Sequence, residues 1–432
     1  MIITNIKNNT LKLFNFKLLR KSEFFKSLST LMTGTILSQL VGFLLMPVLT
    51  RLYSKEAFGL LTSFSAVVSF ISSYATLKFD TAIVLPKEEK EAYALLKLSN
   101  YVAVIFICMS CLILYIPINY FKEYDGLQLF ILLGAALSVN YNISALWNIR
   151  KKEFKITTKA KIIQSVGVFL FQLAFYFIYQ VKGLIIGNVC GVLSSGLYLI
   201  LIRRKLVQKS IRESIDKEDL KSVAKRYKDF PTYFVWSNII LNLSANLPTL
   251  LFVNHIPLDL LGLYGVALRL INQPIILIAG NVQSTVLSYM VERRKCKAPI
   301  LMWYLKIIFF LLILSLVGSF ILLWKGELLV SFFLGKEWIR AGTLIKCMLP
   351  MLIGSMITTP ATAAVRVFEM QKYTLFYSII SLGIRIISLS LLFYFNTKFE
   401  ILILIYSMTS LLIIIVNNIF IIRKIIDYEK NT

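Results

Sequence analysis

Long stretches of apolar residues recur along this 432-residue chain, and short polar, mostly basic segments separate them. Each stretch is about 20 residues long or longer, the length that an α-helix needs to cross the hydrocarbon core of a bilayer. No strand-type alternation of apolar and polar residues rises above this helical signal. The pattern predicts twelve membrane helices, near residues 28–50, 57–77, 93–118, 127–148, 160–180, 183–202, 230–254, 260–289, 299–324, 342–365, 374–395 and 400–422.

Composition agrees with a membrane protein. Hydrophobic residues make up 57% of the chain and charged residues only 16%, and a soluble fold of this size cannot bury so much apolar surface. The net charge of +25 raises the question of a nucleic-acid partner. However, the basic residues cluster in the short segments between the apolar stretches, where they determine topology. We therefore expect no nucleic-acid partner.

The basic residues also orient the helices. With the N-terminus in the cytoplasm, 34 of the 47 lysines and arginines fall in inside segments, 8 in outside segments and 5 within predicted helices. This asymmetry is a positive-inside signal. An even number of helices also returns the C-terminus to the cytoplasm. The first apolar stretch has no small-residue cleavage site, which predicts an uncleaved helix and not a removed signal peptide.

The chain contains traces of an internal repeat. Its longest inside segment divides the predicted helices into six and six. In the first half Arg150 precedes Gly167 by 17 residues, and in the second half Arg366 precedes Gly383 by the same distance. Likewise Pro47 precedes the pair Gly59-Leu60, and Pro248 precedes the pair Gly262-Leu263. Because six is an even number, the two lobes start on the same side, and an axis along the membrane normal relates them. Such lobes enclose a cavity near the middle of the membrane.

The predicted fold class is therefore an all-α polytopic membrane protein, with twelve transmembrane helices in two pseudo-symmetric six-helix lobes around a central cavity. The expected parts are a cytoplasmic N-terminal tail (1–27), the first lobe (28–202), a cytoplasmic linker (203–229), the second lobe (230–422) and a cytoplasmic C-terminal tail (423–432).

Polar residues gather on one face of several predicted helices. A helix turns by about 100° per residue, so the face on which each residue lies can be calculated from its position. The helix near 57–77 carries a serine and threonine stripe, and asparagines recur at every fourth position in the helix near 230–254. These residues are Thr62, Ser65, Ser69, Ser72, Ser73, Thr76, Asn238, Asn242 and Asn246. A hydroxyl stripe is compatible with close helix packing or with a wet surface. Aligned asparagines favour a wet or well-bonded face.

Two arginines lie deep in predicted helices. Arg269 interrupts the apolar stretch LYGVALRLINQPIILIAGNV and is followed by Asn272 and Gln273, and Arg385 is nearly central in its helix. A central arginine costs at least about 2.5–3.5 kcal/mol on insertion scales. No acidic residue lies in the interior of a predicted helix, so a partner for a buried ion pair is hard to find. Either the arginines face a hydrated cationic cavity that receives an anion, or they are structural and bond to helix carbonyls.

Other chemistry is sparse. The pair Cys108-x-x-Cys111 has no second pair of ligands, and the only histidine, His255, is near a helix end. The sequence thus predicts no metal site, no cofactor and no catalytic residue.

Three segments resemble a known family, the bacterial polysaccharide-unit (O-antigen, Wzx-type) flippases of the multidrug/oligosaccharidyl-lipid/polysaccharide (MOP) exporter superfamily. The stretch LLMPVLTRLYSKEAFGLLTSF resembles the family's first hairpin, with a proline, then Leu-Thr-Arg, an acidic residue and Phe-Gly. LKFDTAIVLPKEEKEA resembles the cytoplasmic segment that follows. YKDFPTYFVWSNIILNLSANLPTLL resembles the start of the second half. The residues of these motifs are Pro47, Leu49-Thr50-Arg51, Glu56, Phe58-Gly59 and Phe230-Pro231.

The resemblance implies a MATE-like fold and a bacterial inner-membrane location. It also implies that the chain moves an undecaprenyl-pyrophosphate-linked oligosaccharide, for O-antigen or capsule, to the periplasmic leaflet by alternating access. The expected partners are that lipid-linked oligosaccharide, membrane lipid, and the polymerase and chain-length proteins of the same pathway. The alternatives are a cation-coupled multidrug exporter of the same superfamily and a polytopic glycosyltransferase or polymerase acting on lipid-linked sugars. A non-enzymatic flippase is preferred, because neither a membrane carboxylate nor a paired-carboxylate motif is evident.

The candidate substrate contacts follow from this hypothesis. Guanidinium groups suit phosphate oxygens, and side-chain amides suit sugar hydroxyls. Arg51 is either a contact at the outer mouth or an interface anchor. The expected site residues are Arg269, Arg385, Asn242, Asn246, Asn272, Gln273 and Arg51.

Overall fold

The structure is a computed structural model that describes residues 23–115, 126–206, 215–296, 298–368 and 370–430, and these are helical with short turns and no strand. Ten of the described segments are long and apolar enough to cross a membrane. One of them, 154–203, contains two helices. α12 (Val235–Phe252), which is 18 residues long and contains three asparagines and a proline, adds another helix. Together these are the twelve predicted membrane helices, and the chain is a multi-pass membrane protein.

Six of these helices form the first half of the molecule, and a short α5 (Phe79–Ala82) follows the second of them. They are α3 (Glu23–Leu52), α4 (Lys55–Tyr74), α6 (Glu89–Tyr115), α7 (Gln128–Arg150), α8 (Phe154–Tyr179) and α9 (Gly183–Leu206). The helix α11 (Lys217–Arg226) leads to the second half.

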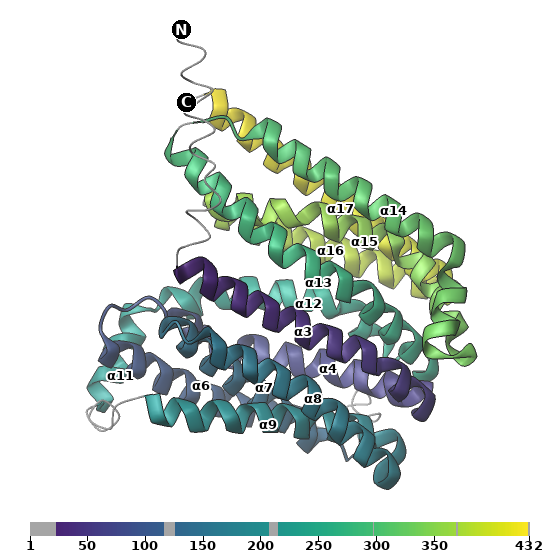
Figure 1. The fold of residues 1–432 in the computed structure, drawn as a ribbon, viewed down its shortest axis with the longest axis horizontal. Coiled ribbons are helices and arrows are strands. Elements are labelled where there is room, and N and C mark those ends of the chain that lie inside the picture. Colours follow the sequence, from purple (N-terminus) through teal and green to yellow (C-terminus); the bar gives the residue numbers. More distant parts are fainter. Residues whose placement is uncertain (1–22, 116–125, 207–214, 297, 369, 431–432) are drawn as a thin grey trace.

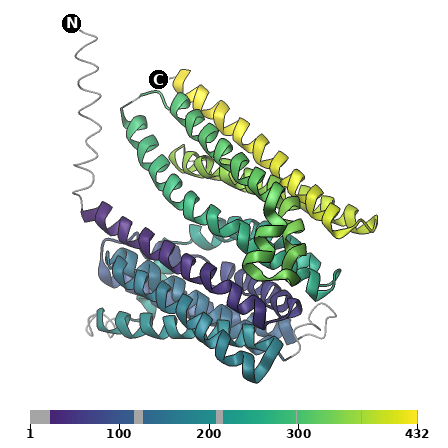
Figure 2. The ribbon, with the colours of Figure 1, turned by 45° about the vertical axis from the view of Figure 1, so that its right-hand side comes forward.

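The second half begins with a π-helical turn over Phe230–Phe234, which contains Pro231 and runs directly into α12. The other helices of this half are α13 (Leu258–Lys295), α14 (Leu301–Leu334), α15 (Ile339–Val367), α16 (Gln371–Tyr394) and α17 (Phe399–Lys430). In Figures 1 and 2 most of the first half, from purple to teal, and most of the second half, from teal-green to yellow, form separate groups.

The helices of the two halves pair in the same way. In each half the first helix packs on the fifth, the second and third pack on the fourth, and the sixth packs on the fourth and fifth. For example, α3 packs on α8 as α12 packs on α16, and α4 packs on α7 as α13 packs on α15. The repeated glycine and proline motifs of the sequence therefore correspond to a repeated helix arrangement.

The two halves approach each other most closely where α4 crosses α13. A Cβ atom on Gly262 would lie 1.9 Å from the carbonyl oxygen of Lys55, and one on Gly59 would lie 2.1 Å from the carbonyl oxygen of Leu258. Only glycine permits so close an approach of two backbones. The repeated Gly-Leu pairs of the two halves are thus in contact with each other.

Further contacts join the halves at the same end of the molecule. The Thr50 hydroxyl donates a hydrogen bond to the carbonyl of Leu334 (3.1 Å), and the buried Trp338 indole donates to the carbonyl of Thr50 (2.9 Å). The Phe58 and Trp338 rings meet edge to face, with centroids 5.1 Å apart. We call this region, with Gly59 and Gly262, the closed end.

Several helices extend beyond the predicted membrane stretches. α14 continues to Leu334, although residues 325–341 were expected to form an outside segment, and α17 continues to Lys430 through most of the expected tail. Glu327 therefore lies within a helix and forms an ion pair with Lys346 (2.8 Å). It is about 40 Å along α14 from Leu301, farther than the roughly 30 Å of a hydrocarbon core.

The inter-lobe linker is more ordered than its charge suggests. Within the described part of 203–229, α11 packs on the start of α6 through the ion pairs Lys90–Asp219 and Arg226–Glu91, both 2.8 Å. Val223 is buried in the same contact. The sequence indicated only a cytoplasmic linker, and in the structure one face of α11 is covered by the first half.

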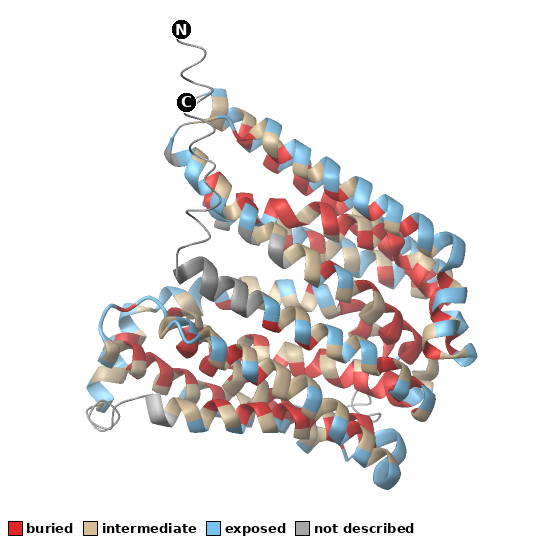
Figure 3. Ribbon diagram, in the orientation of Figure 1, coloured by how far each residue is buried: buried red, intermediate tan, exposed pale blue. Residues whose placement is uncertain are grey.

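Burial separates the central helices from the peripheral ones. α4 and α15 are the most buried membrane spans and α14 is the least buried, as the red and pale blue segments of Figure 3 show. The exposed side chains of α14 are almost all large and apolar, including Phe309, Phe320 and Phe332. Such a surface is suited to acyl chains, so α4 and α15 are central and α14 faces lipid.

Candidate functional site

A cavity of about 650 Å³ is lined by α4, α7, α8 and α9 of the first half and by α12 of the second half. Its volume is within the range of about 300–1,000 Å³ that is usual for small-molecule sites. The lining consists of neutral polar, apolar and basic side chains without a carboxylate. They are Ser65, Ser69, Ser72, Ser73, Ser138, Asn142, Gln164, Asn188, Asn238 and Asn242, then Phe64, Val68, Val192 and Leu241, and finally Lys78.

The serines of α4 form one wall of this cavity. The Ser65 hydroxyl donates to the carbonyl of Leu61 and the Ser73 hydroxyl to that of Phe70, each at 2.7 Å. These bonds use the hydroxyl hydrogens within the helix and leave oxygen lone pairs as acceptors. The Ser72 hydroxyl has no hydrogen-bond partner within the described residues. The serine stripe of α4 thus gives this wall of the cavity a polar surface.

The asparagines of α12 form the adjoining wall. Asn242 donates from Nδ2 to the Ser69 hydroxyl (2.9 Å), which joins the two halves directly. Asn246 donates to the side-chain oxygen of Asn242 (3.1 Å) and to its carbonyl (3.0 Å). Of the two predicted contacts, Asn242 therefore reaches the cavity, and Asn246 lies behind it and orients its amide.

Lys78 is the charged residue of the lining, and it is not among the site residues expected from the sequence. It lies in a turn after α4 in which Leu77 and Lys78 have φ angles of 45° and 61°. Non-glycine residues in this region cost about 1–3 kcal/mol each. The Lys78 N–H donates to the Thr76 hydroxyl (3.2 Å), and the Lys78 carbonyl accepts from the Thr81 hydroxyl (2.7 Å). A turn without Gly, Asn or Asp at these positions has no clear sequence signature.

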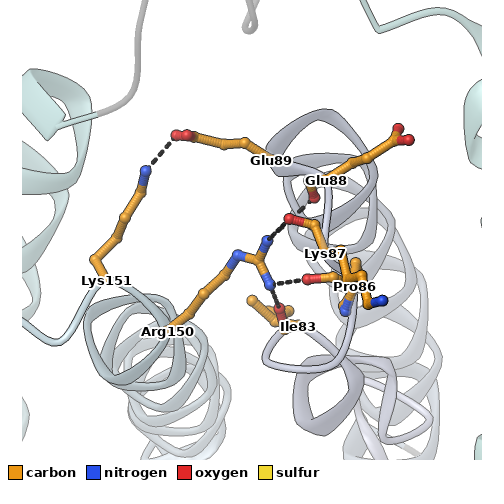
Figure 4. A network of polar contacts seen from close by, with 7 residues as sticks. All are labelled: Ile83, Pro86, Lys87, Glu88, Glu89, Arg150 and Lys151. Carbon is orange, nitrogen blue, oxygen red and sulfur yellow. Dashed lines mark hydrogen bonds and ion pairs between the residues drawn. The ribbon is translucent and has the colours of Figure 1, made fainter.

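Arg150, at the end of α7, holds the chain that follows this turn (Figure 4). Its guanidinium donates hydrogen bonds to four backbone carbonyls, and Lys151 beside it forms an ion pair with Glu89 at 2.5 Å. The acceptors are the carbonyls of Ile83 (3.3 Å), Pro86, Lys87 (3.3 Å) and Glu88 (3.1 Å). The segment between α5 and α6 is thereby fixed to α7.

The structure supplies a partner for Arg385 that the sequence did not reveal. Its Nη1 donates to the hydroxyl (2.8 Å) and the carbonyl (3.2 Å) of Ser244 on α12, and its guanidinium lies 5.9 Å from the centre of the Tyr406 ring. The Arg385 Nε atom is buried without a partner in the described residues. In this conformation Arg385 therefore corresponds to the structural alternative, because it bonds a helix carbonyl inside the second half.

Arg269 differs from Arg385. It is half-buried on α13 and has no hydrogen bond or ion pair within the described part of the chain, and the same holds for Asn272. One turn further on, the side-chain oxygen of Gln273 is buried and has no partner there either. None of the three lines the cavity. The structure thus keeps these polar groups together on α13, apart from the serine and asparagine walls.

Arg51 lies at the far end of the molecule from Lys78. It is exposed in the last turn of α3, next to Thr50 of the closed end, and does not line the cavity. Thr50 was expected only as part of a family motif, yet it takes part in two hydrogen bonds between the halves at the closed end. The predicted site residues therefore fall into separate places, and Asn242 is the one in the cavity wall.

Comparison with known proteins identifies relatives at the level of family and of fold. The family model described as polysaccharide biosynthesis protein matches residues 48–342. No curated protein matches the chain.

Several solved transporters share the fold. The lipid II flippase MurJ, in an inward closed conformation, aligns with a TM-score of 0.66 and 15% identity over 93% of this chain and 90% of that chain. An inward-facing multidrug resistance MATE family transporter of the MOP superfamily gives 0.65 and 12%, over 93% and 96%. A MOP superfamily transporter from Pyrococcus furiosus, described as having a binding pocket of reversed polarity, gives 0.56 and 13%, over 93% and 95%. The predicted two-lobed MOP fold is confirmed.

Proposed function

Because the chain belongs to the polysaccharide biosynthesis protein family, we propose that it is a flippase for an undecaprenyl-pyrophosphate-linked oligosaccharide. It moves this molecule from the cytoplasmic to the periplasmic leaflet of the bacterial inner membrane by alternating access. Both termini are cytoplasmic, and the oligosaccharide is a repeat unit of O-antigen or capsule. The polymerase and chain-length proteins of the pathway then receive the product.

The composition of the cavity is the observation that supports this proposal. Its ten serine, asparagine and glutamine side chains offer donors and acceptors in the places where water would solvate sugar hydroxyls. An oligosaccharide in hydrocarbon would leave these hydroxyls unpaired, and each unpaired group costs several kcal/mol. A cavity with neutral polar walls from both halves removes that barrier, while the lipid tail stays in the bilayer.

The two deep arginines have different parts in this mechanism. Arg269 has no partner in the described residues and is available for phosphate oxygens, with Asn272 and Gln273 beside it. Arg385 becomes available when its bonds to Ser244 break, which a movement of α12 against α16 would accomplish. Arg51 contacts the substrate at the outer mouth after the closed end opens. Asn246 acts through Asn242.

Voltage can contribute to the movement. An inside-negative potential favours outward transfer of an anion by about 2.3 kcal/mol per charge per 100 mV. The cavity lining contains no carboxylate that could serve as a proton relay. We therefore expect flipping of a pyrophosphate lipid in proteoliposomes to accelerate when an inside-negative potential is imposed in the direction of transport.

The MATE-like fold makes a drug exporter the second candidate. The cavity lining argues against an exporter, because ion coupling generally requires a membrane-embedded carboxylate. Deletion of the gene separates these functions. Accumulation of complete lipid-linked units on the cytoplasmic face supports the flippase. Shortened units would indicate an enzyme, and drug sensitivity alone would indicate an exporter.

The cavity can be tested with Asn242→Leu, which removes an amide from its wall, and with the exposed Asn254→Leu as a matched control. Transport of a fluorescent lipid-linked oligosaccharide should fall at least tenfold in the first variant only, because a buried site loses a hydrogen-bonding pair. Equal transport by both variants would show that the sugar does not pass this wall.

A further inference from the structure

The cavity is electrically uneven. Its walls are neutral except at Lys78, which lies just beyond the C-terminal end of α4. The serines extend from there toward the middle of α4, and Ser65 is about 12 Å further along the helix than Ser73. A ligand with one anionic and one neutral polar part would therefore have a preferred orientation in this cavity.

The amino group of Lys78 is not engaged elsewhere. Within the described residues, Lys78 Nζ forms no hydrogen bond and no ion pair. The nearest acid along the chain, Asp80, is buried and accepts a hydrogen bond from the Thr76 hydroxyl at 2.7 Å. The positive charge of Lys78 is thus left for a ligand.

The backbone around Lys78 is held firmly. Thr76 and Thr81 bond to its N–H and its carbonyl, and Phe79 and Ala82 are buried against α6 and α7. Arg150 then ties the following residues to α7 (Figure 4). A strained turn that the surrounding structure over-determines is a feature of ligand-binding sites.

We propose that Lys78 is the first binding point for the anionic headgroup of the lipid substrate, and that the sugars extend from it along the serine and asparagine walls. This inference rests on the proposed function. The positive-inside prediction places Lys78 at the cytoplasmic end, where a headgroup in that leaflet lies. The pyrophosphate therefore binds at the rim of the cavity, and the neutral sugars extend into it.

Binding of two purified lipids to the full-length protein tests this assignment. The probes are undecaprenyl pyrophosphate and undecaprenol, which share a tail and differ in charge, and native mass spectrometry gives the bound fraction. Lys78→Asn removes the charge with a residue that tolerates the left-handed backbone, and Lys78→Arg keeps the charge. Lys87→Gln is the matched control, since Lys87 is exposed in the same segment and does not line the cavity.

We expect Lys78→Asn to bind undecaprenyl pyrophosphate about tenfold more weakly than the wild type, with undecaprenol binding unchanged, because a charge-assisted hydrogen bond is lost. Lys78→Arg and Lys87→Gln should bind both lipids as the wild type does. Wild-type affinity of Lys78→Asn for the pyrophosphate lipid would overturn the inference and leave the flippase proposal intact.

Two further outcomes separate the proposals. If the wild type does not distinguish the two lipids, the headgroup site fails, and transport of a lipid-linked oligosaccharide in proteoliposomes then decides the flippase proposal by itself. If charge-selective binding depends on Lys78 but the wild type moves no lipid-linked oligosaccharide in proteoliposomes, the headgroup site is supported and the flippase proposal is overturned.

Discussion

The crossing of α4 and α13 leads to a prediction about conformational equilibrium. Gly262→Ala would place a methyl group 1.9 Å from the carbonyl oxygen of Lys55, 2.8 Å from its carbonyl carbon and 3.0 Å from the backbone nitrogen of Gly59. All three neighbours are backbone atoms, so a change of rotamer cannot relieve the clash. The helices must separate by more than 1 Å at this point to restore ordinary contact distances of about 3.5 Å.

The size of the effect follows from the cost of overpacking. Inserting a methyl group into a well-packed contact typically costs about 1–3 kcal/mol. Under the proposed alternating-access mechanism this cost applies only while the closed end is closed, because α4 and α13 separate in the opposite conformation. The equilibrium should therefore shift toward that conformation by a factor of about 5 to 150.

Distance measurements by pulsed electron spin resonance can detect this shift. Spin labels at the exposed positions Val181 and Lys398, one on each half, should show a longer distance population in Gly262→Ala. Gly318→Ala is the control, because a Cβ atom there has no neighbour within 4 Å. If Gly262→Ala keeps the wild-type distances and transports normally, the close crossing does not determine which end is closed.

Other predictions concern the arginines and the linker. Arg150→Ala should lower the free energy of unfolding by about 2 kcal/mol in a thermal unfolding assay, because carbonyls of the segment between α5 and α6 lose a charged donor. Arg366 is exposed, and Arg366→Ala should change the free energy of unfolding little in the same assay. Arg385→Ala should abolish transport and Arg385→Lys should retain part of it; full transport by the alanine variant would remove this residue from the substrate path. The hydrogen bond from Lys90 lowers the pKa of Asp219, so the docking of α11 should be complete at neutral pH and weaken as the pH falls below about 4, where hydrogen exchange in α11 should increase. An Asp219→Asn variant should already show the faster exchange at neutral pH, because the ion pair with Lys90 is absent at every pH.

The sequence predicted the polar faces better than it predicted their partners. The asparagines at every fourth position of α12 did indicate a bonded, polar surface, and Asn242 lies in the cavity wall. The sequence left open whether Arg385 faces a hydrated cavity or bonds helix carbonyls, because its partner Ser244 is 141 residues away in the chain and is neutral. Lys78 was missed, because its position depends on a turn that two non-glycine residues form.

The sequence alone determined that the chain crosses the membrane twelve times in two related halves. Hydrocarbon requires every backbone polar group to be bonded within the helix, so about 20 apolar residues suffice to specify each crossing. Only the tertiary structure decided which polar groups meet and which end is closed. Those outcomes depend on helix rotation and on contacts between residues far apart in the chain, such as Gly59 with Gly262. Lipid gives little preference among such arrangements, because its tails are as apolar as the side chains.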